Sequence, residues 1–162
     1  MYDLLAWIEA TALAEALRGS GIWTYGLLNL SHILGISMLF GSVLLLDLRL
    51  LGAWSSIALQ TIMQPTVPLA AIGFTLAVIS GVFMISFNAT EYYGNPFLYI
   101  KMPMIVLGLV NVAVVQRLPA WRRAAAGDSL TPSERRTLAL AGGVSLAIWL
   151  IVLTCGRMIG YW

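Results

Sequence analysis

Charged residues are scarce in this sequence, and their scarcity excludes most soluble folds. Only 10% of the 162 residues are Asp, Glu, Lys or Arg, whereas 60% are hydrophobic. A soluble domain carries about 25% charged residues, and a chain of this length has too much surface to hide so many apolar side chains in one core. Part of the solvent must therefore be lipid, and we expect a single membrane domain over residues 1–162.

Motifs of the common enzyme classes are also missing. The chain has no glycine-rich phosphate loop, no paired carboxylates and no nucleophile elbow, which argues against a catalytic role. The net charge is only +2 and the chain has nine basic residues, too few for a nucleic-acid-binding surface. Cys155 is the only cysteine, so the chain cannot form an internal disulfide.

Long apolar stretches, by contrast, are abundant. A membrane-spanning helix needs roughly 20 mostly apolar residues. Four stretches meet this requirement, at about residues 22–46, 67–87, 97–115 and 138–159. A capping box at residues 131–134, Thr-Pro-Ser-Glu, predicts that the last helix begins before it enters lipid. The sequence thus predicts an all-α fold, an integral membrane bundle of four transmembrane helices in contact with the lipid bilayer.

Two shorter segments outside the spans also favour helix. Residues 3–18 are rich in Ala and Leu but too short and too charged to cross a membrane, so we expect an N-terminal surface helix there. The Gly-Ser-Gly sequence at 19–21 should end it. Pro65 and Pro68 are expected to end a second short helix, over about residues 54–64, and to introduce the second span.

Arginine residues are concentrated at one end of the predicted spans. One follows the first span and five occupy the connection between the third and fourth spans: Arg49, Arg117, Arg122, Arg123, Arg135 and Arg136. Loops rich in Lys and Arg face the cytoplasm, so we expect both termini on the opposite side. Asp47 is expected to meet Arg117 or Arg135, while Arg49 reaches the membrane surface.

Four polar side chains in the spans define a candidate site: Asn29, His32, Lys101 and Arg157. At about 1.5 Å per residue, Lys101 and Arg157 lie roughly 7–8 Å and His32 roughly 13 Å below the outer surface. Asn29 precedes His32 by about one turn. Because buried polar groups in lipid must find partners, we predict that all four line one cavity. The alternative is that Lys101 and Arg157 reach lipid phosphates separately, while His32 bonds to a nearby backbone carbonyl.

His32 is the only histidine and the candidate cofactor and metal ligand, since neutral imidazole is the commonest metal ligand. We expect a b-type haem there, with Lys101 and Arg157 beside its propionates, or a quinone-like site. One histidine excludes bis-histidine ligation within the chain. The iron would need a Met ligand, an open position or a histidine from another subunit. Gly35, one turn further, leaves room for a flat macrocycle or for a close helix.

Soft ligands suggest copper as an alternative to haem. The spans contain five methionines and the cysteine: Met38, Met84, Met102, Met104, Met158 and Cys155. Thioether and thiolate groups suit Cu(I), but methionine is also a routine core filler, and no Met-x-x-Met or Cys-x-x-Cys pair occurs. A copper-handling membrane protein and a structural accessory subunit without a cofactor therefore both stay open.

Several motifs resemble those of a known family. The first span contains His32-Ile33-Leu34-Gly35, then Gly41-Ser42 and the segment Leu-Leu-Leu-Asp-Leu-Arg-Leu-Leu-Gly at 44–52. With Asn-Pro-Phe at 95–97, Lys101 and Gly156-Arg157, these resemble a family of small, uncharacterised bacterial inner-membrane proteins. The His-x-x-Gly element is also loosely similar to the copper-resistance D membrane domain. The resemblance implies a bacterial protein with four membrane helices, and it implies no activity.

Together these features lead to one expected function. We expect a non-catalytic subunit of a bacterial inner-membrane redox or cytochrome assembly, serving electron transport, with both termini facing the periplasm. Small residues recur every four positions at Gly73, Ala77 and Gly81 and at Gly156 and Gly160, and such ridges allow helices to approach closely in lipid. Packing within the bundle is the main explanation of such ridges, and contact between two copies is the alternative. As partners we expect further copies in a homo-oligomer or a larger membrane complex.

Overall fold

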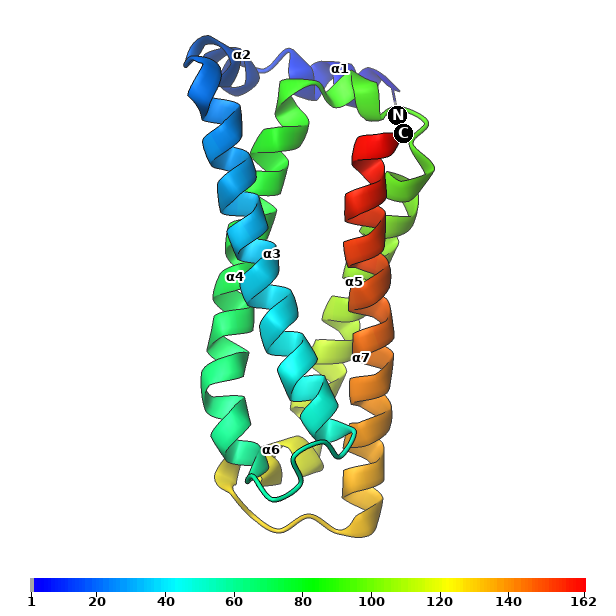
Figure 1. The fold of residues 1–162 in the computed structure, drawn as a ribbon. Coiled ribbons are helices and arrows are strands. Elements are labelled where there is room, and N and C mark those ends of the chain that lie inside the picture. Colours follow the sequence, from blue (N-terminus) through cyan, green and yellow to red (C-terminus); the bar gives the residue numbers. More distant parts are fainter. Residues whose placement is uncertain (1) are drawn as a thin grey trace. The chain divides into compact units, whose positions relative to one another are not determined.

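The computed structural model describes residues 2–162, and this part of the chain contains helices and no strand (Figure 1). The α-helices follow in the order α1 (Tyr2–Glu9), α2 (Ala12–Gly19), α3 (Ile22–Leu50), α4 (Leu59–Phe87), α5 (Pro96–Arg117), α6 (Pro119–Ala126) and α7 (Pro132–Met158). Two 3-10 helices, η1 (Ala89–Tyr92) and η2 (Ile159–Tyr161), complete them. The predicted all-α class is confirmed.

Four of the helices are long and apolar enough to cross a membrane. These are α3, α4, α5 and the continuous segment formed by α7 and η2, with lengths of 29, 29, 22 and 30 residues. Each contains one of the four predicted spans. The chain is therefore a multi-pass membrane protein whose apolar helices contact lipid.

Pro65 and Pro68 lie inside α4, so the prediction that they end a separate helix over residues 54–64 is wrong. Residues 51–57 instead form turns and a bend, in which Gly52 and Trp54 have φ values of 110° and 48°. A proline removes one backbone donor, whereas breaking a helix in lipid would leave several groups without partners. Continuing the helix through both prolines is therefore the less costly solution.

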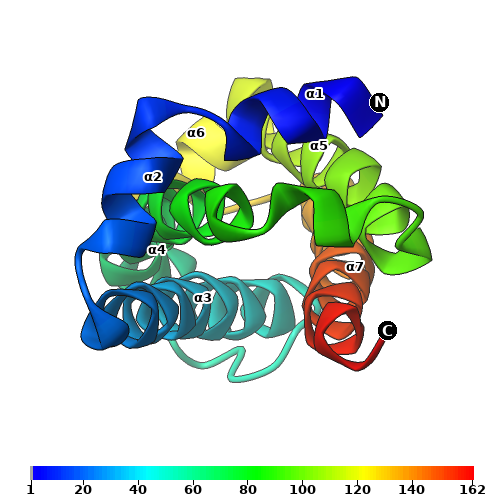
Figure 2. The same cartoon turned by 90° about the horizontal axis from the view of Figure 1, so that it is seen from above.

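The N-terminal segment forms two short helices where the sequence predicted one. Thr11 ends the first and caps the second, because its Oγ1 accepts a hydrogen bond from the Ala14 amide at 3.3 Å. Gly21, with a φ of 101°, then turns the chain into α3. Figure 2 shows α1 and α2 beside the end of α4, and with eight residues each they are too short to span a membrane.

Two compact units make up the chain. The first consists of Met1–Leu39 with Ala71–Asn95, and the second of Phe40–Ala70 with Pro96–Trp162. Both α3 and α4 are divided between the two units. The prediction of a single membrane domain stays a prediction.

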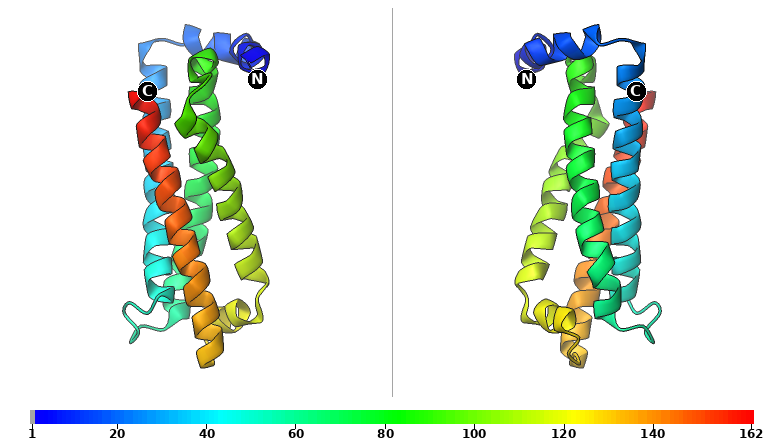
Figure 3. Two further views of the ribbon diagram at one scale, coloured as in Figure 1. Left: turned by 90° about the vertical axis from the view of Figure 1, so that its right-hand side faces the viewer. Right: turned by 90° about the vertical axis from the view of Figure 1, so that its left-hand side faces the viewer.

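The second unit has the larger apolar core. Its buried members come from α4, α5, α6 and α7: Met63, Val115, Ala120, Ala124 and Leu138. Helices α5 and α7 pack side by side, and α6 joins their ends (Figure 3). Trp149 lies against Gly108, where a Cβ atom would be 3.1 Å from its ring. The missing side chain at Gly108 thus allows the two helices to pack around the indole.

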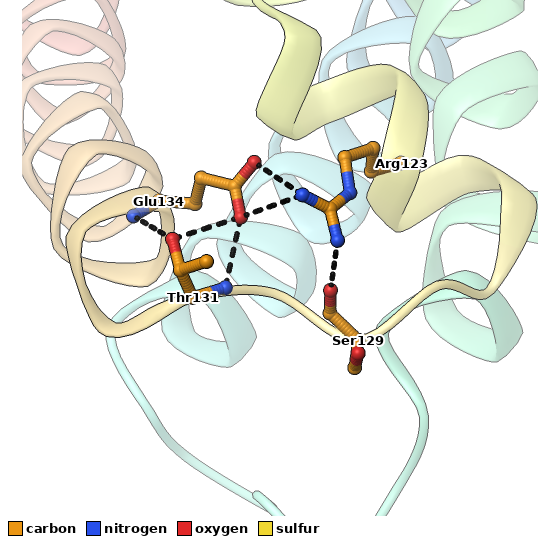
Figure 4. Close-up of polar contacts among 4 residues, drawn as sticks. All are labelled: Arg123, Ser129, Thr131 and Glu134. Atoms are coloured by element: carbon orange, nitrogen blue, oxygen red, sulfur yellow. Dashed lines mark hydrogen bonds and ion pairs between the residues drawn. The ribbon is translucent and has the colours of Figure 1, made fainter.

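The connection from α6 to α7 is held by polar contacts that Figure 4 shows. The predicted capping box is confirmed: the Thr131 amide donates to Glu134 Oε2 at 2.8 Å, and Thr131 Oγ1 accepts from the Glu134 amide at 3.3 Å. Arg123 on α6 pairs with Glu134 at 3.1 Å and donates to the Ser129 carbonyl at 2.7 Å. These contacts tie α6 to the start of α7.

Candidate functional site

His32 of the first unit joins α3 to α4. Its Nδ1 lies 2.8 Å from the carbonyl oxygen of Ala77 and 3.1 Å from the hydroxyl of Ser80. A carbonyl can only accept, so Nδ1 carries a proton and donates it to Ala77, and in the neutral ring the lone pair is on Nε2. Histidines that ligate metals have this arrangement, with one ring nitrogen donating to a carbonyl and the other facing the metal.

Ser80 strengthens this arrangement. It is 2% exposed, and its hydroxyl donates to the Leu76 carbonyl at 2.6 Å. Since the only hydroxyl proton is used in that bond, the oxygen meets His32 as an acceptor. Both partners of Nδ1 therefore favour the same tautomer. Asn29, one turn from His32 along α3, is half-buried.

Glycines explain why the imidazole can lie so close to α4. A Cβ atom on Gly35 would be 2.6 Å from the Ala77 nitrogen, and one on Gly73 would be 2.5 Å from the Leu39 nitrogen. A Cβ atom on Gly81 would be 3.0 Å from Cε1 of His32. The space that Gly35 leaves is therefore filled by helix α4, and of the two uses considered for it, the close helix is the one observed.

Lys101 and Arg157 belong to the second unit. The half-buried Lys101 ammonium lies against Gly156, where a Cβ atom would be 3.2 Å from Nζ. Arg157 is exposed and bonds to Tyr161 of η2, because its Nη2 donates to the phenol oxygen and its guanidinium lies 4.5 Å from the ring centroid. Arg157 is thus held at the end of its helix. This position is consistent with the alternative in which Arg157 reaches a lipid phosphate independently of Lys101.

The four predicted site residues thus fall into two pairs. Asn29 and His32 lie in the first unit, whereas Lys101 and Arg157 lie in the second. The cavity that all four should share stays a prediction. Among residues 2–162, no three His, Cys, Asp or Glu side chains come together in a way that could hold a metal ion.

Glu9 and Arg18 form a polar cluster that sequence reasoning did not identify. Glu9 Oε2 accepts from the Thr90 amide at 2.9 Å and from the Thr90 hydroxyl at 2.8 Å. These bonds, aided by the charge of Arg18, hold the pKa of the Glu9 carboxyl below its usual value. Arg18 donates to the carbonyls of Glu9 at 2.9 Å and Phe87 at 3.0 Å. The cluster fastens the N-terminal helices to the end of α4.

Asp47 of the second unit does not meet an arginine, so that prediction is wrong. It is 4% exposed and faces the Ser145 hydroxyl on α7, while its Oδ2 has no hydrogen-bond partner. Among residues 2–162 the ion pair within 4.0 Å is Arg123 with Glu134. Arg49 instead donates to the carbonyl of Ile57 at 2.7 Å. The Arg49 side chain thus stabilises the turn after α3. Asp47 contacts Ser145 on α7 instead.

Comparison with curated proteins and with solved structures gave no match. The model of a family of unknown function, DUF6644, matches residues 4–162, which is almost the entire chain. This agrees with the resemblance to an uncharacterised family that the motifs indicated. A bacterial source and the likeness to the copper-resistance D domain stay predictions. The chain therefore belongs to DUF6644, a family of unknown function.

Proposed function

We propose that the chain is a non-catalytic subunit of a membrane redox or cytochrome assembly, in which Nε2 of His32 ligates the iron of a b-type haem. The observation that carries this proposal is the 2.8 Å hydrogen bond from Nδ1 to the Ala77 carbonyl. Such a bond fixes the ring orientation and makes Nε2 a stronger donor to a metal. Besides His32, a methionine of this chain or a histidine of another copy would hold the iron, or His32 would hold it alone.

Two further roles are assigned within the same proposal. Lys101 and Arg157 remain our candidates for the groups that neutralise the propionates. If the cofactor is a quinone, the same tautomer makes Nε2 a hydrogen-bond acceptor for a quinol hydroxyl. In both cases the chain supplies position and electrostatics, and the cofactor carries the electron.

A second candidate function is supported by the close packing around His32. Nδ1 also bonds to Ser80, and a Cβ atom on Gly81 would be 3.0 Å from the ring. His32 therefore also suits the role of a fastening between α3 and α4 in a structural accessory subunit. Copper handling by His32 and the methionines of the spans is the other alternative within this proposal.

The absorption spectrum and metal content of the full chain, purified in detergent from haem-replete cells, separate these functions. A Soret band with equimolar iron supports the haem subunit. Bound copper without a Soret band supports the metal-handling protein. A chain with neither, still folded by circular dichroism, supports the structural subunit and overturns the haem proposal.

We also propose that the protein resides in a bacterial inner membrane with both termini in the periplasm. The support comes from the six arginines of the two inner connections. In the second unit, a Cβ atom on Gly127 at the end of α6 would be 2.6 Å from the amide oxygen of Gln60 at the start of α4. The arginine-bearing connections thus meet at one end of that unit. Assembly as a homo-oligomer or in a larger complex belongs to the same proposal.

A further inference from the structure

One face of α7 in the second unit carries a shallow apolar groove with an arginine at one end. The groove has a volume of about 440 Å³ and is lined by Leu51, Arg136, Ala139, Leu140, Gly143, Val144 and Ala147. The residues from α7 recur at spacings of three and four, so they share one helical face. Leu51, just beyond the end of α3, forms the opposite wall, with its Cδ2 atom 3.7 Å from where a Cβ atom on Gly143 would lie.

Arg136 is the only charged residue that lines the groove. Its side chain is exposed and makes no hydrogen bond or ion pair with residues 2–162. Arg123 and Arg49, by contrast, are bound to Glu134 and to the Ile57 carbonyl. The segment from 117 to 136 carries five arginines against two acids, so it attracts anions. The free guanidinium of Arg136 is thus available to an anion from outside the chain.

The length of the groove matches one leaflet of a bilayer. Arg136 and Ala147 are eleven residues apart, which is about 16 Å along a helix. Half of the hydrocarbon core of a bilayer is about 15 Å thick. A chain that begins at Arg136 and follows the groove to Ala147 would therefore reach about the middle of the membrane.

We propose that this groove binds one acyl chain of an anionic phospholipid whose phosphate contacts Arg136. The apolar walls fit the acyl chain, and the guanidinium fits the phosphate, a pairing that basic pockets at the cytoplasmic surface use for anionic lipids. A second copy of the chain fits less well. Two copies inserted in the same direction are related by an axis along the membrane normal, which would bring their Arg136 side chains towards each other. This inference does not depend on the proposed cofactor.

Native mass spectrometry of the full chain in detergent tests the proposal, with dioleoyl phosphatidylglycerol and dioleoyl phosphatidylcholine as probes. We expect preferential binding of phosphatidylglycerol and about fivefold weaker binding after Arg136→Gln, since one arginine loses its attraction to the anionic headgroup. The matched control, Arg135→Gln, removes the same charge outside the groove and should keep the affinity. Gly143→Leu fills the groove and should weaken the binding of both lipids.

Three results would overturn the proposal. An equal loss of phosphatidylglycerol affinity in Arg135→Gln and Arg136→Gln would show that the lipid is attracted to the basic surface in general. Displacement of the lipid by an equal concentration of inorganic phosphate would show a site for a free anion. If Gly143→Leu converts a dimer into a monomer and leaves lipid binding unchanged, the groove is an interface between two copies.

Discussion

Nδ1 of His32 lies 2.8 Å from the carbonyl oxygen of Ala77, so a side chain on α3 bonds directly to the backbone of α4. This relationship determines the tautomer of the imidazole. With the proton on Nδ1, the lone pair of the neutral ring is on Nε2, the nitrogen to which our proposal assigns the iron. The haem proposal and the structural alternative both begin from this bond.

The close contact of α3 and α4 predicts a strong difference between two glycine substitutions on one helix. In Gly35→Ala, the new Cβ atom would be 2.6 Å from the Ala77 nitrogen and 2.9 Å from the Gly73 carbonyl oxygen. These are backbone atoms that cannot turn aside, so the helices must separate. We expect a loss of about 1–3 kcal/mol in the free energy of unfolding, measured by denaturant unfolding in detergent.

Gly41→Ala is the matched control for this prediction. It lies on the same helix, and a Cβ atom there meets nothing within 4 Å. We expect an unchanged stability or a gain of up to about 1 kcal/mol, because alanine favours helix over glycine. Equal effects of the two substitutions would contradict the close contact.

Glu9 gives the docking of α1 a dependence on pH. Its pKa in the folded chain lies below the ordinary value of 4.5, first because of the Thr90 amide bond. The carboxylate therefore stabilises the docked state at pH values above about 4.5, and this contribution is lost as the pH falls through the lower folded pKa. We expect the Thr90 amide resonance in micelles to titrate with a midpoint below 4.5.

Glu9→Gln provides the control, because it keeps the shape of the side chain and removes its charge. The Thr90 titration should then disappear. A midpoint at or above 4.5 in the unaltered chain would be inconsistent with the bonds between Glu9 and Thr90.

The buried contact between Asp47 and Ser145 should be strongly coupled. Ser145→Ala removes a hydroxyl that faces an acid already lacking a partner at Oδ2. We expect a loss of about 1–3 kcal/mol in the free energy of unfolding. In an Asp47→Leu background the same substitution should cost much less, and a double-mutant cycle measures the difference. Additive effects would show that the two side chains do not interact.

Cysteine labelling tests the orientation in the membrane. Ser129 follows α6 and Asn88 follows α4, and both are exposed. In a Cys155→Ala background, we expect an impermeant thiol reagent to label Asn88→Cys in intact cells and to label Ser129→Cys only after the cells are opened. The reverse pattern would place the arginine-rich connections outside and refute the assignment.

The sequence predicted the four spans well, because lipid requires long apolar helices whatever their packing. It failed at Pro65 and Pro68, which lie inside α4. There, leaving several backbone groups unpaired in lipid would cost more free energy than losing the one hydrogen-bond donor that each proline removes. The break at Thr11 was also missed, because a threonine in an otherwise helix-prone segment gives a weak signal until its side chain is seen capping α2.

The surroundings of His32 could not be predicted from the sequence. His32 stands out as the only histidine, and its bond to a backbone carbonyl was one of the two arrangements considered. Its partner could not be named, because the register of α3 on α4 depends on backbone contacts at Gly35 and Gly73. Arg18 was missed for a similar reason. Its acceptors include the carbonyl of Phe87, 69 residues away. Because every residue has a backbone carbonyl, the sequence does not indicate which one will accept a hydrogen bond.

The ratio of haem to protein in the unaltered chain and in His32→Gln tests the central claim most directly. We measure it by the pyridine haemochrome assay on material purified from haem-replete cells, with Ser37→Ala on the same helix as the control. The haem proposal predicts bound haem in the unaltered chain and the control, and a loss of about tenfold or more in His32→Gln. Membrane insertion should be unchanged, because it depends on the hydrophobicity of the spans. An unaltered chain without haem, or a His32→Gln chain that keeps it, would contradict the assignment of His32 as the ligand.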